Sequence, residues 1–487
     1  MEAENEKTSS PTINAPAPRE EDTPPVIQAQ RQRVPFAPPI PWFQVYTIAL
    51  ICQCTVVMYN AVMAIGGADM VNQDVSVRAT VSFFAIMTVS SLCIAGPSVS
   101  RLGPRVCALL GGWTFPLHMG SLLYYRMIAT GALLGVGAPF VLVAQGAILT
   151  AYVPETQRGR AIAMSWFAMN IGGVIASLFG FLGNGNSTGT VPDKGDIWIL
   201  VATCLGWIGG ICICPPSSMM RAGKLQQEAQ GNQNLRETIQ RTFRIMSDRR
   251  VFYMIPLFFC AQVFYQYRKY VESSRTFNLR ACSLFVALYW TSQIIGGFIM
   301  GSILDFPEMS RRARAGVPWL LLFASGMIIW GGYAFQKLTG RHSLQELEDY
   351  IEFKGDRIYL SPLFLYIFYG MYDAFWQSYC YWLIGTLSNA PSVTAILAGA
   401  YTTFQSLGGL VAWRLGAMGK PATAQFAVGW IACMIALVVA IPCALSVTPT
   451  STVSRERAEI ELDELERAAR NDRGRTMQSL EMEDKSD

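Results

Sequence analysis

The sequence predicts an all-α, polytopic membrane protein with about twelve transmembrane helices in two six-helix bundles. Three observations support this fold class. The 487 residues are 52% hydrophobic and only 15% charged, whereas about 25% of residues are charged in a soluble domain. Apolar runs long enough to cross a bilayer, which takes roughly 20 helical residues, recur along most of the chain. A basic connector divides these runs into two similar blocks, which is typical of a duplicated unit.

The N-terminal bundle is expected over residues 42–214. Trp42 opens its first span, because tryptophan is enriched at the membrane interface. Residues 1–41 are polar and rich in proline, which predicts a disordered tail without the pattern of a cleavable signal peptide. The six spans are predicted at 42–64, 77–95, 106–125, 128–152, 160–183 and 197–214.

A polar connector is expected at 215–250, and the C-terminal bundle follows at 251–446. Its spans are predicted at 251–267, 281–304, 317–336, 359–386, 392–413 and 424–446. The charged residues 447–487 form a second predicted tail. An even number of spans places both tails and the connector on one side of the membrane.

The distribution of lysine and arginine predicts which side this is. The tails, the basic connector and loops with bases such as Arg158 and Arg160 share one side. Bases on the other side make the bias modest, but it still favours two cytoplasmic termini in a plasma, vacuolar or endosomal membrane. The sequon at Asn186 would then lie outside, which predicts a glycoprotein.

The span at 359–386 carries one acid, Asp373, near its middle. A charge at that depth costs at least about 2.5–3.5 kcal/mol in lipid, so it is expected to face protein or a water-filled cavity. Helical spacing places Tyr369, Trp376 and Gln377 on the same side. We interpret this face as the lining of a solute pathway. The alternative is that Asp373 only makes a buried hydrogen bond to another helix.

Amide side chains within other spans extend this candidate cavity. They are Gln145 and Asn170 in the N-terminal bundle, and Gln293 and Gln405 in the C-terminal bundle. A single intramembrane amide more often bonds to a neighbouring helix than to a solute. Together with Asp373 and the nearby aromatic rings, however, these groups suit a pocket for a polar organic solute.

The loop after the second span, GPSVSRLGPR at 96–105, is a candidate cytoplasmic gate. Its glycines allow close helix packing and a tight turn, and its arginines can meet helix C-terminal carbonyls or nearby acids. The loop after the eighth span repeats part of this pattern. Ordinary basic cytoplasmic loops would explain the charges but not the glycine spacing. The gate candidates are Gly96, Arg101, Gly103, Arg105, Gly301 and Asp305.

This loop resembles the signature of the major facilitator superfamily, with Ser100 in the place of the usual aspartate of its charge relay. Four longer stretches, 135–152, 288–305, 369–389 and 405–416, resemble the uncoordinated-ninety-three-like family, particularly its fungal members. The resemblance implies two six-helix bundles around a central cavity. That family includes solute transporters, ion-channel regulators and trafficking adaptors.

Several function classes lose support from the sequence. Only two histidines are present, and no catalytic triad, nucleotide-binding loop or metal-ligand spacing can be assembled. The net charge of +4 is spread over loops, so nucleic acid is not an expected partner. We therefore expect neither an enzyme nor a bound cofactor or metal. Residues 160–183 also lack the glycine–proline run of drug–proton antiporters.

Two hypotheses remain. The first is an alternating-access transporter that moves a small organic solute across the lipid bilayer. Efflux of a metabolite is one form that this transport could take. Asp373 would then be its charged element, and Arg101, Arg105 and Asp305 would govern its cytoplasmic gate. The second is a non-transporting regulator or trafficking partner that keeps the fold and binds another membrane protein.

Overall fold

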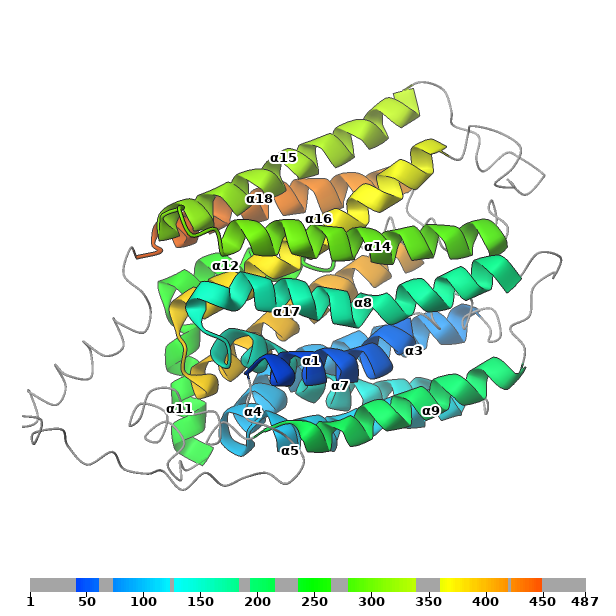
Figure 1. Cartoon of the computed structure of the whole chain (residues 1–487), viewed down its shortest axis with the longest axis horizontal. Helices are drawn as coiled ribbons and strands as arrows, with labels where there is room; N and C mark the ends of the chain where they lie inside the picture. Colours follow the sequence, from blue (N-terminus) through cyan, green and yellow to red (C-terminus); the bar gives the residue numbers. More distant parts are fainter. Residues whose placement is uncertain are drawn as a thin grey trace, which may run out of the picture.

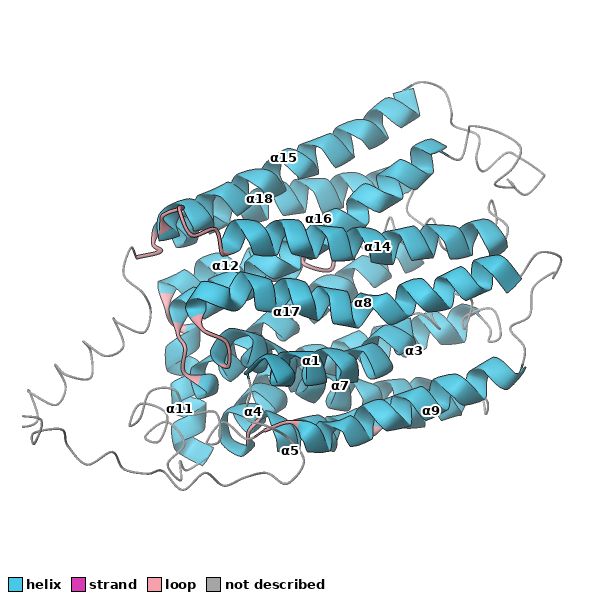
Figure 2. Cartoon of the chain, viewed as in Figure 1, coloured by secondary structure: helices cyan, strands magenta, loops and turns pink. Residues whose placement is uncertain are grey.

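The computed structural model describes residues 41–60, 73–122, 127–183, 193–214, 235–263, 279–338, 360–418 and 422–448. Every regular element within these ranges is a helix (Figure 2). Seven helical stretches of this described part are long and apolar enough to cross a membrane. Most of the helices run in nearly the same direction and form one bundle (Figure 1). This arrangement confirms the predicted all-α membrane fold.

The helices of the N-terminal half overlap the spans predicted over 42–214, with bounds that differ by several residues. Two of these spans contain a short π-helix, a wider turn that is frequent at functional sites. The third predicted span is divided between α5 and α6. The elements are α1 (Pro41–Cys52), η2 (Gln53–Val57), α3 (Gln73–Ser90), η3 (Ser91–Ala95), α4 (Gly96–Leu102), α5 (Pro104–Gly112), α6 (Thr114–Leu122), α7 (Met127–Ala151), η4 (Glu155–Gln157), α8 (Arg158–Gly183), α9 (Asp193–Gly209) and η5 (Gly210–Cys212).

The C-terminal half begins with a helix that the sequence analysis did not predict. This helix, α11, lies within the predicted polar connector and crosses one end of the bundle instead of running along it (Figure 1). The elements are α11 (Leu235–Met246), α12 (Arg249–Cys260), α14 (Leu279–Leu304), α15 (Arg311–Leu338), α16 (Leu360–Leu387), α17 (Pro391–Ala417) and α18 (Ala422–Leu445).

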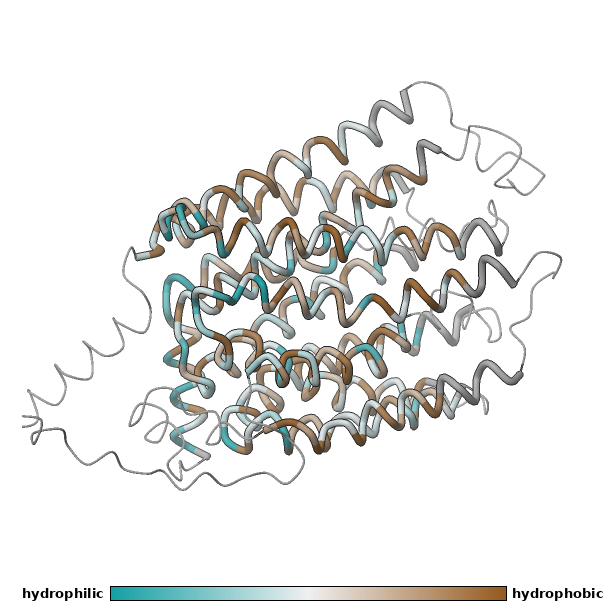
Figure 3. Tube along the Cα trace, viewed as in Figure 1, coloured by the Kyte–Doolittle hydropathy of each residue, from teal (hydrophilic) through white to brown (hydrophobic). Residues whose placement is uncertain are grey.

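Apolar side chains cover the outside of the bundle as well as filling its inside. Leu50, Leu205 and Ile328 are among the large apolar residues that stay exposed on the spans. Hydrophobic residues dominate the length of the helices, and hydrophilic ones gather at the end that carries α11 (Figure 3). This distribution suits a protein whose outer surface meets lipid.

The two halves meet along two sets of helices. On one side α8 packs against α14, and on the other α17 packs against α3, α4 and α7. The indole N–H of Trp166 on α8 donates a hydrogen bond of 2.9 Å to the Ser378 hydroxyl on α16. Backbone contact is closest where Gly159 faces Gly301, since a Cβ on either residue would lie 2.5 Å from the other's carbonyl oxygen.

The helix that carries Asp373 lies at the centre of this assembly. α16 contacts α14, α15 and α17 of its own half and α7 and α8 of the other half. No residue from 369 to 386 is exposed, which agrees with a helix that is apolar around most of its circumference. The polar side chains of α16 therefore face other helices and not lipid.

Candidate functional site

The Asp373 carboxylate is fully buried and accepts hydrogen bonds from three side chains. The Tyr289 hydroxyl and the Gln293 amide of α14 donate to Oδ2 at 3.0 and 2.6 Å. The Gln377 amide, one turn away on α16, donates to Oδ1 at 2.7 Å. Both carboxylate oxygens thus have partners, and the group ties α16 to α14.

This polar cluster continues toward the N-terminal half. The Tyr401 hydroxyl on α17 donates to Gln377 Oε1 at 3.3 Å, and its ring lies 5.1 Å from the ring of Tyr381. The Tyr381 ring in turn packs beside Gly146 on α7, where an added Cβ would be 3.2 Å away. A chain of polar and aromatic groups therefore runs from Asp373 to the other half.

Asn170 lies in the interface between the halves. On α8 it stands between Trp166, which packs on Gly297, and Gly173, which packs on Trp290. Its side chain is buried, and both amide atoms lack a hydrogen-bond partner among the residues that the structure describes. Such a group costs about 1–3 kcal/mol. A solute or a water molecule that bonded to it would recover that free energy.

Two further amides of this region have open hydrogen-bonding capacity. Gln53, in the π-helix η2, is buried with neither amide atom bonded within the described ranges, and it occupies the space left by Gly172. Gln293 uses its nitrogen for Asp373, while its oxygen Oε1 has no partner in the same ranges. Gln145, by contrast, accepts from the Cys52 thiol at 3.4 Å and donates to the Met169 sulfur at 2.9 Å.

Three of the predicted cavity residues lie apart from this cluster. The Trp376 indole donates to the Leu257 carbonyl of α12 at 2.8 Å. The Tyr369 ring lies 6.2 Å from that of Trp330, within the core of the C-terminal half. Gln405 is half-buried on α17 and has no hydrogen bond to another described residue. Other helices surround α16, so the side chains of its predicted polar face do not share one neighbour. Asp373 bonds to α14, whereas Trp376 bonds to α12.

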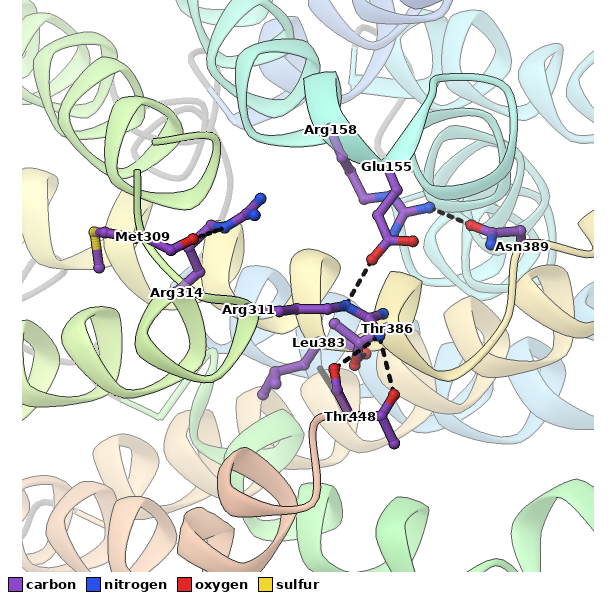
Figure 4. A network of polar contacts seen from close by, with 9 residues as sticks. All are labelled: Glu155, Arg158, Met309, Arg311, Arg314, Leu383, Thr386, Asn389 and Thr448. Carbon is purple, nitrogen blue, oxygen red and sulfur yellow. Dashed lines mark hydrogen bonds and ion pairs between the residues drawn. The ribbon is translucent and has the colours of Figure 1, made fainter. Parts of the chain in front are cut away.

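A second cluster, drawn in Figure 4, joins the two halves at the end of the bundle where α11 lies (Figure 1). Glu155, just before α8, pairs with Arg311 at the start of α15 through an Oε1–Nε distance of 2.7 Å. Arg311 also donates from Nη1 to the backbone oxygen and the hydroxyl of Thr448 at 3.2 and 3.1 Å. The ion pair is mostly buried, so it connects the halves in surroundings with little screening by water.

Arg158 makes the second connection of this cluster. Its side chain is fully buried, and Nη2 donates to Asn389 Oδ1 across the interface at 2.6 Å (Figure 4). The guanidinium occupies the space where a side chain on Gly385 of α16 would begin. A glycine at 385 is therefore needed for the Arg158 position.

Asp305 makes the third connection, by capping a helix of the other half. Its two carboxylate oxygens accept the backbone N–H groups of Gly159 and Arg160 at 2.8 and 2.7 Å. A carboxylate at a helix N-terminus is stabilised by the free N–H groups and by the helix dipole. Burial raises the pKa of Asp305, while these two N–H groups and the charges of Arg160 and Arg158 oppose the rise. We call Glu155, Arg158, Asp305, Arg311 and Asn389 the latch.

The predicted gate loop at 96–105 contributes backbone packing instead of charge. A Cβ on Gly96 would lie 3.6 Å from the Gly399 Cα on α17. Gly103 forms a turn with φ of 83°, a value that favours glycine, and Pro104 starts α5. Arg101 is exposed and Arg105 half-buried, and neither makes an ion pair with another described residue.

The sequence analysis placed Asp305 and Gly301 in the gate but missed the role of Glu155 and Asn389. Glu155 is an acid in a short segment that is otherwise basic, and this contrast was the available signal for an ion pair. Asn389 gives no such signal, because its partner is 231 positions away in the chain. The predicted glycosylation residue, Asn186, lies outside the described residues.

Comparison with known proteins identifies the class of this fold. The family model of the Major Facilitator Superfamily matches residues 16–413. The structure of the proton:xylose symporter XylE aligns with a TM-score of 0.57 at 12% identity, covering 83% of this chain and 94% of that one. The chain therefore belongs to the major facilitator superfamily and has the fold of its membrane transporters.

Curated relatives define the family within this class. UNC93-like protein 1 of Arabidopsis thaliana is 32% identical over 403 residues, which cover 80% of this chain and 87% of the relative. UNC93-like protein C922.05c of Schizosaccharomyces pombe is 30% identical over 409 residues, with 82% and 81% covered. The chain is a member of the UNC93-like family.

Proposed function

We propose that this protein moves a small organic solute across the bilayer by alternating access, as uptake or as metabolite efflux. The observation that carries the proposal is the latch, because three separate contacts join the two halves at one end of the bundle. Contacts of this kind must break when that end opens. A fold built as two halves that rock against each other uses such contacts as a gate.

The buried amides between the halves support a solute site at mid-depth. Asn170 and Gln53 have open donors and acceptors within the described part, and the Gln293 oxygen is open in the same sense. Asn170 and Gln53 belong to α8 and η2 of the N-terminal half, and Gln293 of the C-terminal half bonds to Asp373. A polar solute that entered between the halves would satisfy them. Asp373 would be the charged element, either by taking up a proton during the cycle or by pairing with a cationic group of the solute.

We assign the latch end to the cytoplasm. Hydrophilic residues gather there (Figure 3), and α11 with its arginines lies at the same end (Figure 1). Positive charge is typical of cytoplasmic loops. In this assignment the latch closes the cytoplasmic side.

The experiment is solute uptake into proteoliposomes that contain the full-length protein. The vesicles are incubated with a mixed metabolite extract, and their contents are identified by mass spectrometry, with Asp373→Asn and protein-free vesicles in parallel. We expect wild type to accumulate at least one solute and Asp373→Asn to lose most of this uptake. The proposal fails if wild type takes up no more of any solute than empty vesicles do, in either direction of the gradient.

A further inference from the structure

Helix α11 lies at the depth where the membrane spans end. It crosses the end of the bundle (Figure 1) and contacts α4 of one half and α12 and α17 of the other. Only Ser247 and Asp248 separate it from α12. The Asp248 side chain caps α12 by accepting the N–H of Arg250 at 2.8 Å. α11 is therefore fixed where α12 enters the bundle.

One flank of α11 is apolar and exposed. Ile239 is 45% exposed and Phe243 is 71% exposed, and these two residues are one helical turn apart. At about 100° per residue they lie about 40° from each other around the helix axis. Phe252, near the start of α12, is also exposed, at 65%. Large apolar groups are thus presented outward on both helices where α11 meets α12.

The remaining surface of α11 divides into a buried flank and a polar flank. Thr238 is buried against the bundle, and Ile245 beside it is half-buried. Gln240 and Arg244 are exposed on the third flank. The centres of the three flanks follow one another at roughly 100–130° around the helix. This division suits a helix that meets protein with its buried flank, lipid with its apolar flank and water with its polar flank.

The charge of this segment identifies the lipid that suits it. Residues 236–250 contain five arginines and two acids. Arg236 is exposed next to the apolar flank, and Arg244 is exposed on the polar flank. Basic side chains beside an apolar flank attract anionic headgroups while the apolar groups enter the acyl boundary. A neutral apolar partner would gain nothing from the arginines.

We propose that α11 lies in the surface of the bilayer, with Ile239 and Phe243 in the acyl boundary and Arg236 and Arg244 bound to anionic phospholipid headgroups. The helix also contacts both halves. Its lipid contact is therefore made at the same end as the latch. The proposal concerns the bilayer as a partner and is independent of which solute, if any, the protein moves.

The test places a photoactivatable residue, p-benzoylphenylalanine, at position 243 of the full-length protein. The matched control carries it at Gln240, which is exposed on the polar flank of the same helix. Both proteins are reconstituted into phosphatidylcholine vesicles with a minor fraction of phosphatidylserine and irradiated, and lipid adducts are quantified by mass spectrometry. A third protein with the probe at Ile239 guards against a local folding defect at position 243.

We expect several-fold more lipid adduct at positions 243 and 239 than at 240. Phosphatidylserine should be enriched in the adducts by about fivefold for each arginine at the surface. In the double variant Arg236→Gln, Arg244→Gln, the share of phosphatidylserine among the adducts should fall to its fraction in the vesicles. Equal adduct at all three positions, adduct to protein alone, or unchanged enrichment in the double variant would each overturn the proposal.

Discussion

At the scale of single residues, the buried guanidinium of Arg158 depends on a missing side chain. Gly385 leaves the space that Arg158 fills, and Asn389 then accepts its hydrogen bond. Charged groups are almost never fully buried without partners. A substitution of Asn389 or of Gly385 should therefore destabilise the buried Arg158, and the loss of stability should appear first at the latch.

Gly385→Ala is expected to displace Arg158 and to weaken the latch by about 1–3 kcal/mol, the cost of losing a buried hydrogen bond. Hydrogen exchange of residues 155–163 in nanodiscs should become faster. The control is Gly316→Ala on α15, where nothing lies within 4 Å of the new Cβ. Equal exchange in the two variants would contradict the assigned role of Gly385.

Asp373 allows its charge to be separated from its packing. In Asp373→Asn the Gln377 side-chain amide can rotate by 180°, so that its oxygen accepts a hydrogen bond from the new NH₂ group. The Gln377 NH₂ group then donates to the Tyr401 hydroxyl, which reverses the bond seen in the wild type. We therefore expect a melting temperature near that of the wild type. Asp373→Leu removes the acceptor that Asp373 offers to Tyr289, Gln293 and Gln377, and a lost buried hydrogen bond costs about 1–3 kcal/mol. Thermal unfolding in detergent measures both. A large loss of stability in Asp373→Asn would show that the charge itself holds the fold.

The residues of this cluster were only partly predictable. Helical spacing and the rarity of an intramembrane acid were enough to group Asp373 with Gln377. Tyr289 and Tyr401 could not be selected, because aromatic residues are common in every span. Trp376 was grouped with the polar face by spacing alone, although the structure turns its N–H toward α12.

At the scale of elements, hydrophobic runs located nearly every helix. The predicted span 160–183 and the observed α8 differ by two residues at the start and end at the same position. The polar composition of 215–250 concealed α11, since its apolar residues are few and only their spacing indicates a helix. A polar stretch of sequence is thus a good indication of exposure to water, but it does not show that the segment lacks a helix.

The turn between α4 and α5 is sensitive to substitution at Gly103, which has a positive φ. Gly103→Ala places a Cβ on a residue with φ of 83°, which costs about 1–2 kcal/mol. We expect a lower melting temperature. Gly120→Ala, in the helix α6 with nothing within 4 Å of the new Cβ, should be neutral or stabilising. The reverse order of the two variants would contradict the importance of this turn.

At the scale of the whole molecule, the proposed gate consists of contacts between the two halves. The loop at 96–105 matches the superfamily signature but lacks its acid at Ser100, and the loop after α14 supplies one through Asp305. Local sequence could indicate these two loops. It could not show which helix of the other half each one meets, because such contacts join residues that are about 145 positions apart.

The raised pKa of Asp305 gives a pH dependence to the closed latch. In the open form this carboxyl would meet water and regain its ordinary pKa, so the closed form binds a proton more tightly. The closed population should therefore rise as pH falls through the raised pKa and decrease again as pH rises. Spin labels at the exposed positions 160 and 312 measure this population as the pH is lowered from neutral.

The control for this titration is Asp305→Asn, which cannot change its charge. Its distance distribution should be independent of pH over the same range. A pH response that persists in Asp305→Asn would assign the effect to another group.

The three contacts of the latch have one further consequence. On the side of the N-terminal half they all originate within residues 155–160, although their partners come from two separate segments of the chain, the connection from α14 to the start of α15 and the connection after α16. A displacement of that short stretch removes every one of them together. Loosening of this end should consequently be cooperative, with few half-released intermediates, and one inhibitor or antibody fragment that immobilises these six positions would arrest the entire cycle.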